Sequence, residues 1–234
     1  MTTIGSVMFM YIFHVTILIP YLMKNRKPFD LKKIIIAYDV LLVAINAYFW
    51  FYALGHIADM WDFRNPKTDT SDKAIQFINT AHLYYLSKLI DLLDTYFMAL
   101  KKKNSHISVL HVWHHVSVPA AGWAYMKYNP YMPTEYMFPL LNGFIHVVMY
   151  GYYALAALGP QYQKYLWWKK YITQMQLIQM TIAFVWFNLV YLKSTDIPAG
   201  YHASNIGNAT ALFLLFLNFY IQAYRKENKQ IKAQ

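Results

Sequence analysis

The sequence contains no cysteine among its 234 residues. Structural disulfides, thiolate zinc sites and cysteine nucleophiles are therefore excluded. Charged residues are also scarce, at 14% of the chain, whereas an ordinary soluble domain has about 25%. Internal repeats, low-complexity tracts and a polar segment of domain size are missing as well. A soluble enzyme and a disulfide-stabilised secreted domain are thus excluded as descriptions of this chain.

Apolar residues take the place of the missing charge, with 58% of the chain hydrophobic and 19% aromatic. They form long runs that approach the ~20 residues needed by a membrane-crossing helix. We therefore predict one all-α integral membrane domain over 1–234, without a cleavable signal peptide. Its seven expected transmembrane helices are at about 4–23, 34–55, 75–100, 107–126, 134–158, 171–192 and 206–224.

The distribution of basic residues predicts the orientation of these helices. The formal net charge is +10, and most lysines and arginines lie after the first, third and fifth runs and in the tail 225–234. The other connections carry more acidic than basic residues. By the positive-inside rule, we expect a lumenal or extracellular N-terminus and a basic cytosolic tail. The basic cytosolic side of the protein would attract membrane lipids or phosphate-bearing substrates. Because topology and these partners account for the positive charge, nucleic acid is not an expected partner.

The third run contains the motif KLIDLLDT, in which ionisable residues fall at membrane depth. Lys88, Asp91 and Thr95 are spaced for one helix face, and Asp94 adjoins them. Charges inside a bilayer are costly, so such residues are functional candidates. Two interpretations stay open: the lysine and the carboxylate neutralise each other between helices, or they position a substrate or tune a neighbouring imidazole.

The fourth run contains HVWHH. His111, His114 and His115 have the i, i+3 and i+4 spacing that puts them on one face of a helix. A lone buried histidine is usually structural, but three on one intramembrane face indicate a functional site. Pro119 is expected to kink the helix just beyond them.

The fifth run, NGFIHVVMYGYY, has a polar and aromatic stripe at helical spacing. The stripe consists of Asn142, His146, Met149, Tyr150 and Tyr153. Methionine and tyrosine alone are typical of packing, whereas the added histidine and asparagine favour a binding site.

The sixth run, TQMQLIQ, places Thr173, Gln176 and Gln179 three residues apart. These side chains either belong to a binding site or hydrogen-bond between helices, and both interpretations stay open. With the predicted topology, the four motifs converge in the cytosolic half, with His146 near mid-depth. A polar pocket continuous with an apolar interior suits an amphiphile with a polar head and a long tail.

The histidines allow two kinds of chemistry. HxxHH is similar to the histidine boxes of membrane desaturases, but those enzymes need several boxes and this chain has one. A mononuclear metal site with His146 and Asp91 or Asp94 stays an alternative, although we expect no metal. We favour general-base or nucleophilic chemistry. An acyl-imidazole is a competent acyl donor, and a dry cavity would protect it from hydrolysis.

The ordered motifs resemble those of the very-long-chain fatty acid elongase family, the 3-ketoacyl-CoA synthases of the endoplasmic reticulum. KLIDLLDT resembles KxxExxDT, HVWHH is HxxHH, NGFIHVVMYGYY fits NxxxHxxMYxYY, and TQMQLIQ fits TxxQxxQ. LMKNRKPFDL resembles the family's basic stretch after the first helix. Asp91 departs from the usual glutamate, the N-terminal segment is shorter than in many members, and the tail lacks a dilysine retrieval signal.

This resemblance implies a decarboxylative Claisen condensation in the endoplasmic reticulum membrane. A long-chain acyl-CoA and malonyl-CoA would give a 3-ketoacyl-CoA two carbons longer, CO2 and CoA. No cofactor is expected besides malonyl-CoA as co-substrate. The reductase and dehydratase of the elongation cycle, membrane lipids and a second copy of the chain are the expected partners.

We expect His114 to attack the acyl thioester, with His146 as its partner across the cavity and either histidine as the acyl carrier. His111 and His115 would orient this pair or shuttle protons. The other candidates are substrate-binding residues: Lys88, Asp91, Asp94, Thr95, Asn142, Met149, Tyr150, Tyr153, Thr173, Gln176 and Gln179. Asn142, Gln176 and Gln179 would hold carbonyl or enolate oxygens. A metal-dependent lipid desaturase or hydroxylase and a seven-helix receptor or transporter are the alternatives.

Overall fold

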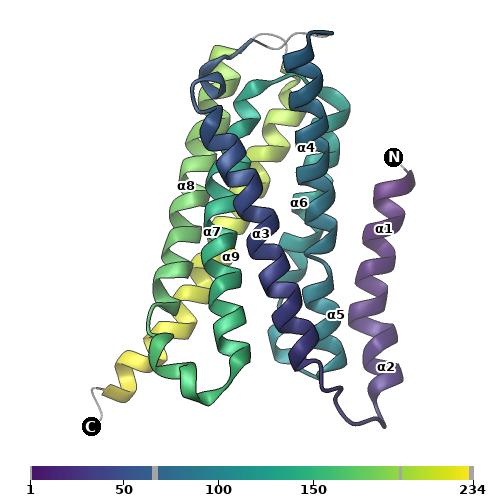
Figure 1. Ribbon diagram of the computed structural model, residues 1–234, viewed down its shortest axis with the longest axis vertical. Helices are drawn as coiled ribbons and strands as arrows, with labels where there is room; N and C mark the ends of the chain where they lie inside the picture. Colours follow the sequence, from purple (N-terminus) through teal and green to yellow (C-terminus); the bar gives the residue numbers. More distant parts are fainter. Residues whose placement is uncertain (1, 65–67, 195–196, 232–234) are drawn as a thin grey trace. The chain divides into compact units, whose positions relative to one another are not determined.

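The computed structural model describes residues 2–64, 68–194 and 197–231 (Figure 1). Every regular element in these ranges is a helix, which confirms the all-α prediction. The chain forms two compact units, here called unit 1 and unit 2. Unit 1 comprises Met1–Tyr38 and Pro66–Met132, and unit 2 comprises Asp39–Asn65 and Pro133–Gln234. The prediction of a single domain over 1–234 stays a prediction.

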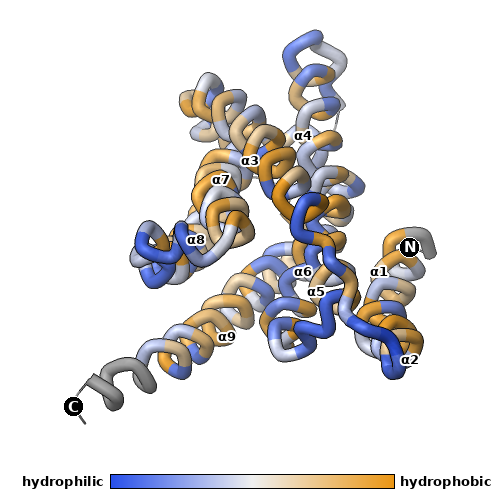
Figure 2. Tube along the Cα trace, turned by 60° about the horizontal axis from the view of Figure 1, so that its bottom comes forward, coloured by the Kyte–Doolittle hydropathy of each residue, from blue (hydrophilic) through white to orange (hydrophobic). Residues whose placement is uncertain are grey.

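Five helical segments of the described chain are long and apolar enough to cross a membrane. They are Ile4–Met23, Lys32–Gly55, Pro133–Leu158, Lys169–Lys193 and Ala199–Tyr224. Many large apolar side chains on these helices are exposed, including Phe9, Leu192 and Val185. Figure 2 shows hydrophobic colour along α3 and α9 and hydrophilic colour in the connection after α2. Exposed apolar surface on this scale fits lipid rather than water, so the chain is a multi-pass membrane protein.

The first helical run of unit 1 contains a π-helical turn. Its parts are α1 (Thr2–Phe13), η1 (His14–Leu18) and α2 (Ile19–Met23), which follow one another without a break. Pro20 cannot donate a backbone hydrogen bond, and its ring crowds the carbonyl four residues earlier. The wider π turn just before it relieves this crowding and lets the helix continue.

The predicted helix over 75–100 is divided in two, which corrects the sequence prediction. α4 spans Asp72–Ile90 and α5 spans Leu93–Leu100. At the break, the backbone N–H of Leu92 donates to Leu89 O at 3.3 Å and that of Thr95 donates to Leu92 O at 3.2 Å. These three-residue steps wind the chain more tightly than an α-helix. Thr95 is therefore turned relative to the residues of α4.

α6 (Val109–Tyr128) carries HVWHH and packs along α4. The Ser108 hydroxyl caps its start by accepting a hydrogen bond from the His111 backbone N–H at 3.2 Å. Such a cap is a strong helix-start signal, and it places the first histidine in the first turn. The helix continues through Pro119, whose missing N–H cannot bond the carbonyl of His115.

The core of unit 1 joins the first helical run to α5 and α6. Its buried side chains are Met8, Tyr11, Val15 and Leu92. Tyr96, Val112 and Val116 are among the partly buried residues packed against them. The tyrosine at the centre of this apolar cluster has to satisfy its hydroxyl inside it.

Unit 2 is built on α3 (Lys32–Gly55) from Asp39 onward, together with α7 (Met137–Leu158), α8 (Lys169–Lys193) and α9 (Ala199–Ile231). α8 packs along both α7 and α9. The short helices η2 (Asp59–Trp61) and η4 (Pro133–Tyr136) contact each other at one end, and η5 (Pro160–Tyr165) follows α7.

α9 extends beyond the predicted transmembrane segment 206–224 at both ends. The prediction followed the apolar run alone, whereas the more polar residues on either side of it are helical too. Of the predicted basic tail 225–234, residues 232–234 lie outside the described residues.

Gly122 allows the close approach of α4 and α6. A β-carbon there would lie 2.1 Å from Tyr85 Cδ1 and 2.7 Å from Tyr85 Cγ. Gly122→Ala is expected to destabilise the protein by about 1–3 kcal/mol, since the ring has to move within a packed interface. Thermal unfolding of the detergent-purified protein measures this effect.

Gly151→Ala is the matched control, because Gly151 also lies inside a helix and its added β-carbon meets nothing within 4 Å. Alanine there is expected to be neutral or to stabilise the protein by about 0.5–1 kcal/mol. Equal changes in melting temperature for the two variants would contradict the role of Gly122.

Candidate functional site

α6 gathers the three imidazoles predicted to share a face. The ring centroids of His111 and His115 are 4.2 Å apart, and those of His114 and His115 are 5.5 Å apart. His115 is buried, and the other two are half-buried. The prediction that these side chains lie together is confirmed by these distances, whereas their catalytic roles stay predictions.

A hydrogen-bond chain holds the first of these histidines. His111 Nε2 lies 2.8 Å from Thr95 Oγ1, and Thr95 Oγ1 lies 2.7 Å from the Tyr11 hydroxyl. Thr95 is fully buried and Tyr11 is nearly so. Three elements, α1, α5 and α6, thus meet at one threonine. The hydroxyl of Thr95, predicted to bind substrate, is engaged by two protein side chains.

Lys88 and Asp91 form a buried ion pair at the end of α4. Lys88 Nζ lies 3.2 Å from Asp91 Oδ2, and the two side chains are only 3% and 6% exposed. The ammonium also lies 5.0 Å from the centre of the Tyr84 ring, a favourable cation–π arrangement. Asp94 is half-buried on the first turn of α5. The lysine and the carboxylate therefore neutralise each other, but within the end of α4 and not between helices as the sequence interpretation had it.

In unit 2, the predicted stripe on α7 is buried in its first part. Asn142, His146 and Tyr150 are buried, and the rings of His146 and Tyr150 are 5.5 Å apart. Tyr153 is 40% exposed, with its ring 6.0 Å from that of Tyr150. The stripe therefore runs from a buried histidine to the surface of the chain.

The α8 motif contacts this stripe at one point. Gln176 Nε2 donates a hydrogen bond to Met149 Sδ at 3.6 Å, so the two predicted residues are neighbours. Thr173 and Gln179, each three residues from Gln176, are buried. The glutamine–methionine contact supports the interpretation that α8 polar groups hold helices together. It is compatible with contact to a ligand as well.

Sequence patterns missed several buried polar residues, among them Tyr11, Asp39 and Asn46. Tyr11 lies in an apolar run with no motif around it, and its bond to Thr95 spans 84 positions of the chain. Asp39 and Asn46 are both about 1% exposed on α3. Their seven-residue spacing puts them on one helix face, a signal that was available in the sequence. Asn46 Nδ2 donates to the Leu42 carbonyl at 2.8 Å.

Within the described part of the chain, no group of three or more histidine, aspartate or glutamate side chains is arranged to hold a metal ion. The candidate residues of unit 1 offer imidazole and hydroxyl groups and a neutralised ion pair. Those of unit 2 offer amide, phenol and hydroxyl groups and the imidazole of His146. The predicted pairing of His114 with His146 joins unit 1 to unit 2, and it stays a prediction.

The chain is similar to known proteins over almost its whole length. A family model described as ELO: GNS1/SUR4 family matches residues 1–232. A Drosophila melanogaster protein named "Very long chain fatty acid elongase 7" is 37% identical over 227 residues, 95% of this chain and 69% of that protein. A Rattus norvegicus protein of the same name is 38% identical over 229 residues, 96% of this chain and 81% of that protein. The rat "Very long chain fatty acid elongase 5" is 37% identical over 213 residues, 89% and 70% of the two chains.

The buried ion pair predicts a non-additive stability pattern. Lys88→Met or Asp91→Leu alone is expected to cost about 3–5 kcal/mol, because each leaves the remaining charge buried without its counter-ion. The double variant Lys88→Met/Asp91→Leu should regain most of that loss. Thermal unfolding of the four proteins measures the coupling.

Asp62→Asn is the control, because the Asp62–Arg64 pair lies at the surface with the arginine side chain 85% exposed. An exposed pair contributes less than about 1 kcal/mol. If the Lys88 and Asp91 variants were as mild as this control, or if their effects simply added, the pair would not stabilise unit 1.

Proposed function

Since the chain belongs to the ELO (GNS1/SUR4) family, we propose that it is the condensing enzyme of very-long-chain fatty acid elongation. Its relatives are named very long chain fatty acid elongases, which supports a role in elongation for this enzyme. The finer proposal is that it joins a long-chain acyl-CoA to malonyl-CoA and releases a 3-ketoacyl-CoA, CO2 and CoA.

One observation carries the proposed chemistry. α6 holds three imidazoles, and the ring centroid of His115 lies 4.2 Å from that of His111 and 5.5 Å from that of His114. The chain has no cysteine. Acyl transfer through a covalent intermediate needs a nucleophile, and imidazole is the best candidate among the side chains of these motifs. The apolar surroundings favour it, because an acyl-imidazole has to be kept from water.

In the first half-reaction, a nitrogen of His114 attacks the carbonyl carbon of the acyl thioester. The carbon–sulfur bond breaks, and the CoA thiolate leaves and takes up the proton lost by the imidazole. The acyl group is then bound to nitrogen. His146, buried on α7, is the second histidine of the proposal, as the acceptor of a proton or as the alternative acyl carrier.

In the second half-reaction, malonyl-CoA loses CO2, and the bond electrons form an enolate of acetyl-CoA. The enolate carbon attacks the acyl carbon and the carbon–nitrogen bond breaks. The imidazole then takes up a proton supplied by solvent, because the net reaction consumes one proton. Asn142, Gln176 and Gln179 are the proposed donors to the carbonyl and enolate oxygens. Neutral amides suit this role, since they stabilise a developing oxyanion without protonating it.

The proposed enzyme has seven crossings, with a lumenal N-terminus and a cytosolic C-terminus in the endoplasmic reticulum membrane. The charge asymmetry of the connections supports this orientation. The exposed lysines near the predicted cytosolic ends would meet the phosphates of CoA. Reductase and dehydratase enzymes of the elongation cycle, and a second copy of the chain, are the proposed protein partners.

A condensation assay on the purified protein tests the function. We expect radiolabelled CO2 to be released from [3-14C]malonyl-CoA only when a long-chain acyl-CoA is present, with the matching 3-ketoacyl-CoA as product. His114→Ala should reduce this rate by at least about 100-fold, the usual contribution of a positioned acid, base or nucleophile.

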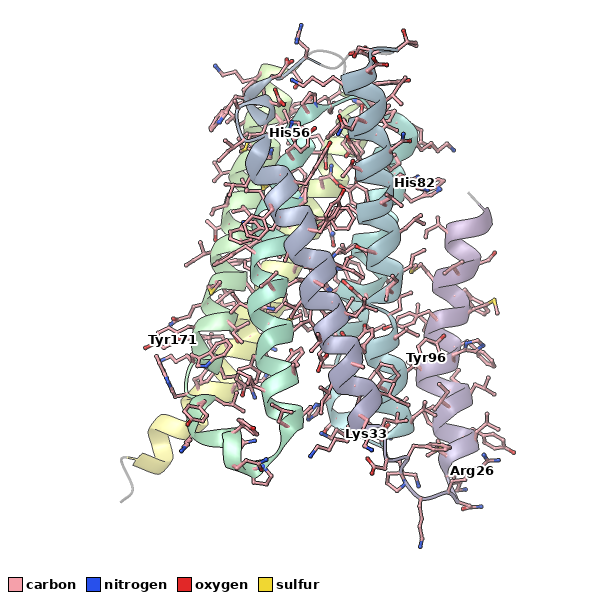
Figure 3. The ribbon with its side chains drawn as sticks, in the orientation of Figure 1. Arg26, Lys33, His56, His82, Tyr96 and Tyr171 are labelled. Atoms are coloured by element: carbon pink, nitrogen blue, oxygen red, sulfur yellow. The ribbon has the colours of Figure 1, made fainter. Side chains whose placement is uncertain are left out.

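His82→Ala is the matched control, because His82 is an exposed histidine on α4, well separated from Tyr96 along unit 1 (Figure 3). It should keep full activity. Intact-mass spectrometry after exposure to acyl-CoA alone should show one acyl adduct that His114→Ala lacks. Full activity of His114→Ala without any adduct would overturn the covalent mechanism, and no CO2 release with any acyl-CoA would overturn the function.

The topology can be tested cleanly because the chain has no native cysteine. Single substitutions Lys73→Cys, Lys103→Cys and Lys127→Cys introduce thiols at exposed positions. They lie at the start of α4, between α5 and α6, and at the end of α6, respectively. In sealed microsomes, a membrane-impermeant maleimide should label only the Lys103→Cys protein. Equal labelling of all three would show that α4–α5 and α6 do not cross the membrane.

A further inference from the structure

The hydrogen-bond chain from Tyr11 to His111 has a direction that its protons determine. Thr95 Oγ1 stands between two partners, the Tyr11 hydroxyl at 2.7 Å and His111 Nε2 at 2.8 Å. The threonine hydroxyl has one proton and two lone pairs, so it donates to at most one partner and accepts from the other or from both. Acceptance from both would leave the buried threonine proton without an acceptor among the described residues. The two remaining arrangements put opposite tautomers on His111.

In the first arrangement, the tyrosine O–H donates to Thr95, and Thr95 donates to an unprotonated His111 Nε2. In the second, His111 carries its proton on Nε2 and donates to Thr95, which donates to the tyrosine oxygen. The tyrosine proton then needs another acceptor. Among the residues whose side chains the structure describes, Thr95 Oγ1 is the hydrogen-bond partner of the Tyr11 hydroxyl.

The surroundings of Tyr11 favour the first arrangement. Its side chain is 2% exposed in a cluster with Met8, Val15 and Leu92, so water does not offer the missing acceptor. A buried O–H without an acceptor costs about 1–3 kcal/mol. The first arrangement gives the tyrosine proton and the threonine proton an acceptor each and leaves neither in the apolar cluster.

We propose that Tyr11 and Thr95 fix His111 as the tautomer protonated on Nδ1, which makes His111 a positioning residue and not the nucleophile. Its Nε2 lone pair accepts the threonine proton and is therefore not available to attack a thioester. The tautomer assignment stands on this geometry alone; its meaning for acyl transfer rests on the proposed function. The nucleophilic role then falls to His114 or His115.

The first helix thereby contributes to the histidine site. Tyr11 comes from α1, and its ring centroid lies 6.4 Å from that of His115. A second hydrogen bond ties the same segments together, between His14 Nδ1 and the Tyr96 hydroxyl at 3.0 Å. Figure 3 shows Tyr96 reaching from α5 toward the first helical run. This second bond joins the same elements without touching the histidines of α6.

Nitrogen-15 NMR of the histidine-labelled protein in nanodiscs tests the tautomer directly. The His111 signals are assigned by their loss in His111→Gln. In the wild-type protein, we expect Nε2 of His111 to give the signal of an unprotonated nitrogen and Nδ1 that of a protonated one. A protonated Nε2 would overturn the inference, even if every variant below failed to fold.

The variants test whether the chain of hydroxyls imposes this state. Tyr11→Phe removes the first donor, so both tautomers of His111 should become populated. The kcat of condensation should fall about two- to tenfold, the effect of one hydrogen bond, with the KM for acyl-CoA unchanged. Thr95→Val should have the same or a larger effect, and Thr95→Ser, which keeps the hydroxyl, should restore both the NMR signature and the rate.

Tyr96→Phe is the matched control, because it also removes a tyrosine hydroxyl that bonds the first helical run to α5. It should leave the His111 tautomer and kcat as in the wild type. Equal loss of kcat in Tyr96→Phe and Tyr11→Phe, with no change in the tautomer, would reduce Tyr11 to a packing role. If no acyl-CoA supports condensation while the NMR result holds, the proposed function fails and the tautomer assignment stands.

Discussion

The need to satisfy polar groups away from water determines the arrangement of this protein more than any other constraint. An amide or hydroxyl moved into apolar surroundings without a partner costs several kcal/mol, and an ion costs more. Thr95, fully buried, meets this constraint by bonding side chains from two other helices. Lys88 and Asp91 meet it by neutralising each other. The bonds at Thr95 join α1, α5 and α6, whereas the Lys88–Asp91 pair is local to the end of α4. Such bonds add direction to apolar packing, which alone has none.

The sequence predicted those parts of the structure that depend on local periodicity. The i, i+3 and i+4 spacing of HVWHH correctly placed its imidazoles together, and the spacing of KLIDLLDT correctly joined Lys88 to Asp91. The break between α4 and α5 was not predicted, because an apolar run does not distinguish four-residue from three-residue backbone bonds. Tyr11 was not predicted either. Its role depends on a contact 84 positions away, which no pattern within α1 encodes.

Helix length and composition likewise give only part of the membrane arrangement. Five helical segments of the described chain meet a simple criterion for a span, whereas α4 and α6 are more polar. The polar residues of α6 include the three histidines of the candidate site, whereas α4 carries Lys88 together with polar residues outside the site, such as Asp72, Lys73 and Gln76. A transmembrane helix that carries polar functional residues has a lower mean hydropathy than one that only spans the bilayer. In the proposed topology, the weak span signal of α6 follows in part from its three histidines.

The two units divide their polar side chains by chemical type. Those of unit 1 include an ammonium, a carboxylate and closely spaced imidazoles, which exchange protons and hold charge. The buried polar side chains of unit 2 are mainly amides, phenols and hydroxyls, together with His146 and Asp39. Neutral donors orient a carbonyl without reacting with it, whereas imidazoles form and break bonds. A condensation that first transfers an acyl group and then stabilises an enolate needs both sets. The tautomer of His111 matters in this division, because it decides which of three adjacent nitrogen bases has a lone pair left to react.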